Sequence, residues 1–112
     1  MIQKNIKISF VSDKLEKEFD KLRFGRSDER ELFFQIINAF DDMKNNLNNC
    51  IKIPKKLWPK FYVKKYKINN LWKYNLKKGW RIIFTLESKE LIVISIVLEI
   101  LNHKEYEKRF GY

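Results

Sequence analysis

The fold follows from residues 70–84, which read NLWKYNLKKGWRIIF. The only glycine of this stretch, Gly79, comes after two lysines and before an apolar run that contains Arg81. A loop over residues 77–79 would place Gly79 where a type I turn is followed by a left-handed residue, the position that needs a positive φ. This turn chemistry predicts a β-hairpin with a three-residue loop.

The register that follows from this loop separates an apolar face from a polar face. It pairs Asn75 with Arg81, and Trp72 with Phe84. Directly opposed residues share a face, so large apolar side chains fill one side and Lys73, Asn75 and Arg81 occupy the other. A two-residue loop would mix polar and apolar side chains on both faces. Because the buried face sets the register of a strand, we expect the three-residue loop.

The next turn, tested in the same way, predicts a loop over residues 88–90. The strand that follows would direct its even-numbered apolar residues to the core: Ile92, Ile94, Ile96 and Leu98. The polar face would then gather Lys73, Asn75, Arg81, Ser95, Glu99 and His103, with Tyr106 just beyond. Simpler explanations are an ordinary ion pair between Arg81 and Glu99 and, for Lys73, protection of an edge strand against aggregation.

The remaining sequence completes an α+β pattern. Alternating apolar residues predict a half-buried strand over residues 6–10. Helical spacing predicts one helix that ends at Gly25 and another that starts at Ser27. The last ten residues, HKEYEKRFGY, predict one or two helical turns. We expect one domain over residues 1–112, with two helices packed on a four-stranded, mostly antiparallel sheet in the order β-α-α-β-β-β.

Residues 51–69 carry the weakest pattern. Pro54 and Pro59 argue against a regular helix, so we expect a basic loop anchored by Leu57 and Trp58.

The single cysteine, Cys50, excludes an intrachain disulfide and a cysteine-based zinc site, and favours a reducing, cytoplasmic setting. The N-terminus lacks the apolar core of a signal peptide. The longest apolar run, residues 91–101, falls short of the ~20 residues that span a bilayer.

The positive charge is confined to one segment. The chain has 24 basic and 14 acidic residues, a formal net charge of +10. Residues 43–86 contain no acid, yet they hold 12 of the basic residues and eight aromatic residues. Clustered positive charge beside aromatic rings suits a polyanion with stackable bases. The lysines could instead only solvate a surface, but their segregation favours nucleic acid.

Three pieces of the sequence resemble the RelE/ParE superfamily of type II toxin–antitoxin systems. They are NLWKYNL, GWRIIFTLESKELIVISIVLEI and NHKEYEKRFGY. A strand, two helices and a three-stranded meander are similar to the family's order of elements. The resemblance is specific over residues 70–112, whereas the helices match by pattern. The segment 54–69 is longer than in the small toxins of the family.

RelE-like members are ribonucleases that cut mRNA, usually on the ribosome, without a metal or other cofactor. The resemblance implies that Arg81 stabilises the scissile phosphate, that Lys73 contacts it, and that Tyr106 orients or stacks on a base. His103 or Lys104 falls at the second basic position, and a histidine can transfer a proton at neutral pH. The expected RNA-binding residues are Lys64, Lys65, Lys77, Lys78, Lys104 and Asn75.

One position departs from the family. Ribosome-dependent members have a second lysine as base where this chain has Asn75, which cannot abstract a proton. His103, Glu99 or a lysine such as Lys77 would serve instead, or cleavage would be weak or absent.

The leading expectation is a cytoplasmic mRNA endoribonuclease that inhibits translation and is neutralised by a cognate antitoxin, with no membrane partner. Two alternatives remain open: a ParE-like inhibitor of DNA gyrase, and a non-catalytic module that binds RNA or a partner.

Overall fold

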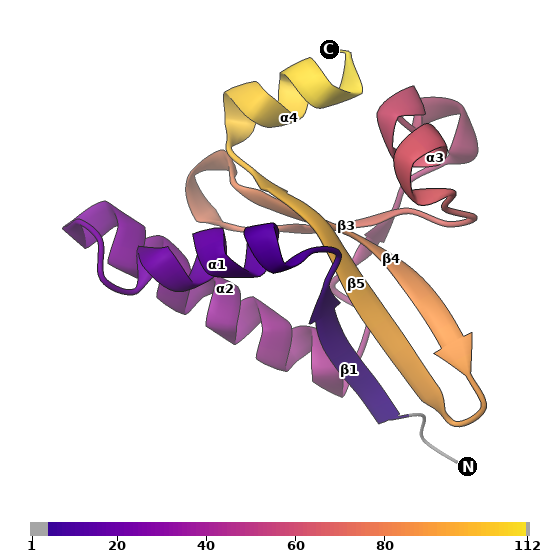
Figure 1. Cartoon of the computed structure of the whole chain (residues 1–112), viewed down its shortest axis with the longest axis horizontal. Helices are drawn as coiled ribbons and strands as arrows, with labels where there is room; N and C mark the ends of the chain where they lie inside the picture. The colour runs from indigo at the N-terminus through magenta and orange to yellow at the C-terminus, as the bar shows by residue number, and fades with distance from the viewer. Residues whose placement is uncertain (1–4, 112) are drawn as a thin grey trace.

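The computed structural model describes residues 5–111 and contains one five-stranded sheet with helices on both faces (Figure 1). In chain order the elements are β1 (Asn5–Phe10), α1 (Asp13–Leu22), α2 (Ser27–Asn45), β2 (Ile51–Lys52), α3 (Lys60–Tyr66), β3 (Trp72–Asn75), β4 (Arg81–Lys89), β5 (Ile92–Leu101) and α4 (His103–Phe110). Short 3₁₀ turns occupy Lys55–Leu57 and Lys77–Gly79.

The strand order is β1-β5-β4-β3-β2. β1 runs parallel to β5, and the other neighbouring pairs are antiparallel. The predicted α+β class and mostly antiparallel sheet are therefore confirmed. The expected four strands become five, because the two residues of β2 pair with β3. Lys73 thus lies on a strand with neighbours on both sides, and the interpretation of Lys73 as an edge-strand residue is wrong.

The two N-terminal helices begin and end near the positions that the sequence predicts. Ser12 is the N-cap of α1, and its side chain accepts a hydrogen bond from the backbone N–H of Leu15 at 3.2 Å. α1 and α2 pack together on one face of the sheet (Figure 1). Their buried stripes meet the sheet in a first core of Phe19, Leu32, Phe33, Ile36, Ala39, Phe40, Met43, Ile82, Phe84 and Val97.

A second core lies on the opposite face. Ile83 alternates with the neighbours that face the helices, so its side chain points to the other side of the sheet. There it packs with residues of α3 and α4 in a cluster of Ile53, Tyr62, Leu71, Ile83, Leu98, Leu101 and Tyr106. The predicted terminal helix is confirmed as α4, where the rings of Tyr106 and Phe110 lie 4.6 Å apart.

The register of the β3–β4 hairpin is as predicted. Asn75 pairs with Arg81 and Trp72 with Phe84, and Leu76 donates its N–H to the carbonyl of Trp80 at 2.8 Å. The turn itself differs from the expected type I geometry. Lys78 has φ 60° and Gly79 has φ 82°, so two successive residues are left-handed, as in a type I′ turn.

The predicted register of β5 is wrong over its first half. Lys89 pairs with Ile92, so the loop has two residues, and Glu90 has φ 53°. Leu86 pairs with Ser95, where the predicted loop would pair it with Ile92, so the register is shifted by three residues. A shift by an odd number exchanges the faces, which turns Val97 to the first core and Ile96 to the second. Ser95 is fully buried opposite Leu86, away from the polar face on which the sequence placed it.

A β-bulge restores the predicted faces at the end of β5. Phe84 pairs with Val97 but Ile83 pairs with Glu99, so one extra residue, Leu98, enters the strand. Glu99 and Leu101 consequently share the face of Ile83 and Arg81, as the sequence predicts.

The predicted loop over residues 51–69 contains regular structure. The two prolines begin elements instead of preventing them: Pro54 precedes the 3₁₀ turn and Pro59 precedes α3. Trp58 is an anchor, since its Nε1–H donates to the carbonyl of Ile53 at 2.8 Å. Leu57 is 40% exposed and does not anchor the segment. None of the helices in residues 5–111 is long and apolar enough to cross a membrane.

Candidate nucleic-acid interface

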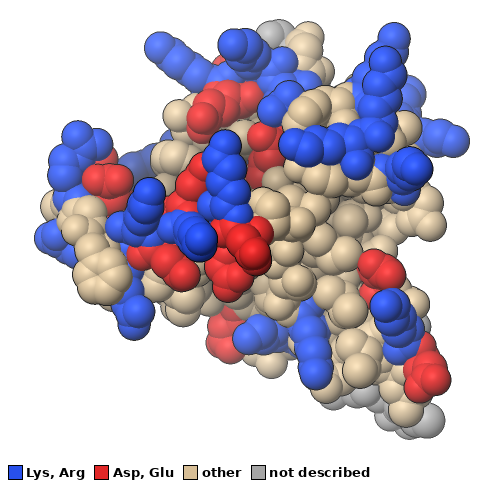
Figure 2. Space-filling model, viewed as in Figure 1, with Lys and Arg blue, Asp and Glu red and all other residues tan. Residues whose placement is uncertain are grey.

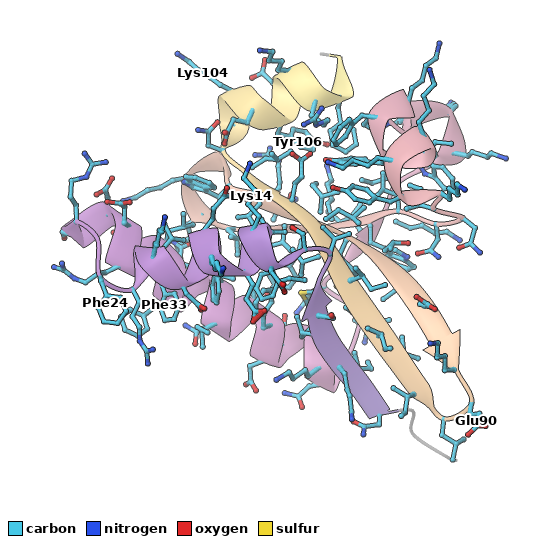
Figure 3. All side chains as sticks on the ribbon, viewed as in Figure 1. Lys14, Phe24, Phe33, Glu90, Lys104 and Tyr106 are labelled. Carbon is cyan, nitrogen blue, oxygen red and sulfur yellow. The ribbon has the colours of Figure 1, made fainter. Side chains whose placement is uncertain are left out.

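Lys73, Arg81 and Tyr106 meet on the second face of the sheet. Lys73 Nζ donates to the Tyr106 hydroxyl at 3.0 Å and lies 5.0 Å from the centre of its ring. The guanidinium carbon of Arg81 lies 4.5 Å from the same ring centre. Tyr106 points from α4 toward the sheet (Figure 3) and is 5% exposed. The ring therefore holds two cations from neighbouring strands close together.

The Arg81 guanidinium is fixed at one end. Its Nη1 donates to the carbonyl of Gly79, two residues earlier. Its Nε is buried, and no described residue accepts a hydrogen bond from it. The side chain as a whole is half-buried. A planar cation that is held in place is suited to an anion such as phosphate.

His103, the first residue of α4, lies at the edge of this cluster. A Cβ placed on Gly79 would lie 2.9 Å from the Cβ of His103 and 3.6 Å from Nη1 of Arg81. Gly79 is therefore the point at which the histidine and the arginine approach each other. The imidazole is 60% exposed, and its Nε2 contacts the Glu107 carboxylate one turn along α4.

The expected RNA-binding residues are spread over several elements, and three of them are directed away from these groups: Lys77, Lys78 and Lys104. Lys78 forms an ion pair with Glu31 of α2 at 3.5 Å, and the N–H of Lys77 donates to Gln35 of α2 at 3.0 Å. The hairpin turn thus packs against α2. Asn75 is exposed on β3. Lys104 points away from the body of the molecule (Figure 3). Lys64 and Lys65 lie on α3.

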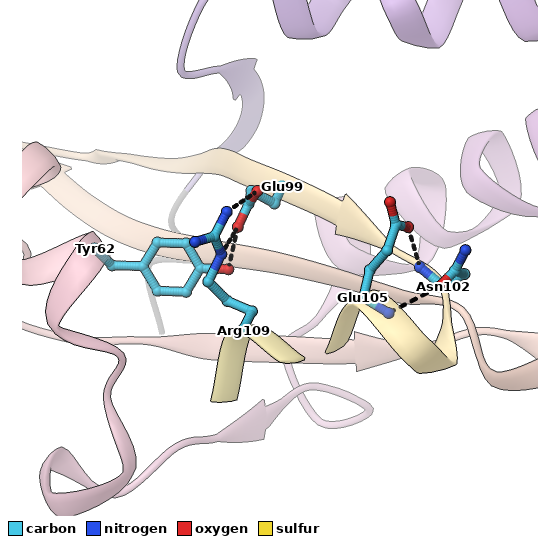
Figure 4. Close-up of polar contacts among 5 residues, drawn as sticks. All are labelled: Tyr62, Glu99, Asn102, Glu105 and Arg109. Atoms are coloured by element: carbon cyan, nitrogen blue, oxygen red, sulfur yellow. Dashed lines mark hydrogen bonds and ion pairs between the residues drawn. The ribbon is translucent and has the colours of Figure 1, made fainter. Parts of the chain in front are cut away.

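A partly buried polar network ties α3 and α4 to the sheet (Figure 4). Glu99 accepts hydrogen bonds from Arg109 Nε at 2.8 Å, from Arg109 Nη2 at 3.0 Å and from the Tyr62 hydroxyl at 2.6 Å. Burial and the bond to Glu99 raise the pKa of Tyr62 far above its usual range. The bond to Glu99 also raises the pKa of Arg109.

This network overturns two sequence-based interpretations of Glu99. The carboxylate pairs with Arg109, not with Arg81, and both of its oxygens are occupied, so it is not available as a general base. Neither Arg109 nor Tyr62 was expected at the site. Arg109 lies in the quoted terminal segment, but the resemblance gave it no role, and α3, which carries Tyr62, was itself not predicted.

The aromatic residues of the basic segment are not a stacking surface. Residues 43–86 are all described, and none of their eight rings is exposed. Tyr62 and Phe84 are fully buried. Phe61 is covered by the guanidinium of Arg109 at 4.0 Å from its ring centre. The clustered positive charge is therefore not accompanied by open ring faces, because all eight rings lie in the two cores or pack against them.

The described residues contain no group of three or more His, Cys, Asp or Glu side chains that could hold a metal ion. Burial, with a smaller effect of Asp42, raises the pKa of the Cys50 thiol to about 11, which disfavours a reactive thiolate. Comparisons with protein-family models, with curated proteins and with solved structures give no match.

Proposed function

We propose that the protein is a RelE-like toxin, a metal-independent endoribonuclease that cuts mRNA on the ribosome and is neutralised by a cognate antitoxin. The observation that carries this proposal is the pair of cations, Lys73 and Arg81, that one buried ring holds on a single face of the sheet. Phosphoryl transfer requires such fixed positive charge, because the transition state carries more negative charge on the phosphate than the substrate does.

The proposed reaction is an internal transesterification. A base takes the proton of the ribose 2′-hydroxyl, and the oxygen attacks the adjacent phosphorus. The bond from phosphorus to the 5′ oxygen then breaks, and that oxygen receives a proton from an acid. The products are a 2′,3′-cyclic phosphate and a free 5′-hydroxyl. In this scheme Arg81 and Lys73 stabilise the charged phosphorane, and no metal takes part.

His103 is the best candidate for proton transfer. Its imidazole is exposed at the start of α4, where Gly79 brings the histidine backbone close to Arg81, and an imidazole can both accept and donate a proton. The other candidate bases have weaker claims: Glu99 is engaged by Arg109, and the backbone of Lys77 is held against α2 by Gln35. The burial of Tyr106 favours a role in positioning the two cations over stacking on a base.

The proposal of an antitoxin partner is supported by the net positive charge of the protein. A protein with a formal net charge of +10 suits an acidic or amphipathic partner segment laid over its surface. The proposed setting is the cytoplasm, where mRNA and ribosomes are found.

The test is cleavage of RNA in EDTA by the wild type and by Arg81→Gln, Lys73→Gln and His103→Gln. We expect each variant to lose about 100-fold or more in rate, the size typical of a lost proton-transfer or oxyanion group. Lys89→Gln, on the exposed end of β4, is the control and should keep full activity. Circular dichroism would verify that all variants fold.

Mapping of transcript ends after induced expression would test the ribosomal setting. Cuts at ribosome-occupied codons support the proposal. Full activity in both the Arg81 and His103 variants would contradict the assigned site. Intact mRNA with arrested gyrase would indicate a ParE-like inhibitor instead.

A further inference from the structure

Six lysines gather on the segment that joins β2 to β3. They lie on the 3₁₀ turn, on α3 and at its C-cap, within a stretch that contains no acid: Lys55, Lys56, Lys60, Lys64, Lys65 and Lys67. All six are exposed, and none forms an ion pair with a described residue. Figure 2 shows blue side chains projecting from the region of α3 without red among them. We call this surface the lysine lobe.

The lysine lobe presents charge without open rings. Lys60 and Lys64 are four residues apart and share one side of α3, whereas Tyr62 points to the opposite side and is fully buried. Phe61 lies under Arg109, and Lys65 covers it at 5.2 Å from the ring centre. Single-stranded nucleic acids are usually held by stacking of bases on exposed rings, which this surface does not offer.

The carboxylate nearest to α3 in the hydrogen-bond network is already neutralised. Glu99 contacts α3 through the Tyr62 hydroxyl, and Arg109 binds both of its oxygens. The charge of the lysine lobe is therefore not offset by an acid packed beneath it.

We infer that the lysine lobe binds the phosphodiester backbone of a nucleic-acid duplex without reading its sequence. Ammonium groups on long, flexible stems contact phosphates, and such contacts carry no sequence information. Lysine also contributes a point charge that is not tied to one geometry, which suits a regular row of phosphates. This inference goes beyond the proposed cleavage and does not depend on it, since binding requires neither Arg81 nor His103.

An anionic membrane fits this surface less well. A helix that lies in a membrane interface inserts a continuous apolar face between the lipid headgroups. α3 has seven residues, and its aromatic side chains belong to the second core. The large apolar residues that this segment exposes are Leu57 and Val63, at 40% and 42%.

The experiment compares two variants that remove the same charge from different places. Lys55, Lys56, Lys60 and Lys64 are changed to Gln in the lobe variant. Four other exposed lysines are changed to Gln in the control: Lys7 on β1, and Lys14, Lys17 and Lys21 on α1, which also carries four acids. The probe is a short duplex of 2′-O-methyl RNA, which attack by a 2′-hydroxyl cannot cleave, and fluorescence anisotropy measures its dissociation constant at several salt concentrations.

We expect the lobe variant to bind the duplex at least about tenfold more weakly than the wild type. The slope of log binding constant against log salt concentration should become shallower by about three, because four phosphate-neutralising lysines are lost. The control should bind within about threefold of the wild type, and a duplex of scrambled sequence within about twofold. A DNA duplex serves as a second probe, to show whether the surface accepts both backbones or RNA alone.

Three results would overturn the inference: an equal loss of affinity in both variants, tighter binding of a single strand than of the duplex, or lysine-dependent binding to anionic vesicles without binding to either duplex. The Arg81→Gln variant separates the two proposals. If it loses cleavage but keeps duplex affinity, both stand. If the wild type cleaves no RNA yet binds the duplex, only the proposed function fails.

Discussion

Arg109 binds both oxygens of the Glu99 carboxylate, with Nε–Oε1 and Nη2–Oε2 distances of 2.8 and 3.0 Å. This bidentate pair joins α4 to β5, and the Tyr62 hydroxyl adds α3 through a third bond to the same carboxylate. The two side chains of the pair are 31% and 22% exposed, so solvent screens their attraction only in part. The second face of the sheet therefore depends on one charged network as well as on its apolar core.

Replacement of Arg109 by Met should lower the free energy of unfolding by about 2 kcal/mol. Methionine can still cover the Phe61 ring, but Glu99 would lose two charge-assisted hydrogen bonds in a half-buried site. Urea denaturation measures the loss. Lys108→Met, at the neighbouring exposed position, should change stability by about 0.5 kcal/mol or less. Similar stabilities for the two variants would show that the pair contributes little.

Gly79 and Gly111 offer a matched comparison. Both have a positive φ, 82° and 78°, but a Cβ on Gly79 would come within 2.9 Å of the His103 Cβ, whereas nothing lies within 4 Å of one on Gly111. Gly111→Ala should therefore cost only the left-handed conformation, about 1 kcal/mol. Gly79→Ala should cost more, about 2–3 kcal/mol, because the start of α4 must move.

The measurement for this pair is again urea denaturation, with RNA cleavage as a second readout. We expect only the Gly79 variant to lose cleavage, since it displaces His103 from Arg81. Equal stability losses would mean that the approach of the hairpin to α4 is not a tight constraint.

The raised pKa of Tyr74 leads us to expect a loss of stability at alkaline pH. Its hydroxyl donates to Asp42 at 2.7 Å, and burial, followed by this bond, raises the pKa of Tyr74 to about 12. Below the ordinary tyrosine pKa of about 10, folded and unfolded chains both keep the proton. As the pH rises from there toward 12, the unfolded chain ionises first, so the free energy of unfolding must fall.

In Tyr74→Phe the free energy of unfolding should fall less steeply between pH 10 and 12 than in the wild type. Urea denaturation across that pH range would measure the difference. Part of the fall should remain, because the pKa of Tyr62 is raised as well. The comparison at pH 8 serves as the control, since there the variant reports only the lost hydrogen bond to Asp42. Parallel pH profiles for the two proteins would contradict the assignment.

The β3–β4 hairpin shows how far sequence reasoning reaches in this chain. Its register could be predicted because a glycine-containing turn and the alternation of side chains, all within residues 70–84, agree on one pairing. The β4–β5 hairpin has no glycine in its turn, and apolar residues fill both sides of β5. Without a turn signal or a polar face, neither the register of β5 nor the bulge at Leu98 could be read from the pattern.

The candidate site was predictable only in its strand residues. Lys73 and Arg81 share a face because of the hairpin register, so the sequence placed them together correctly. The ring between them comes from α4, and its burial depends on how that helix packs. Arg109 and Tyr62 were missed because their contact with Glu99 needs the bulge and α3 in place, and neither has a strong local signal.

Local signals were thus sufficient to predict the β3–β4 hairpin, the two N-terminal helices, the terminal helix and the position of the basic segment. The reason is that turn chemistry, side-chain periodicity and composition all involve residues that are neighbours along the chain. Long-range packing set the face of each residue in β5, the partner of Glu99 and the inward direction of the aromatic rings in residues 43–86. These features depend on contacts between segments that are far apart in sequence, where burial of apolar area outweighs local preference.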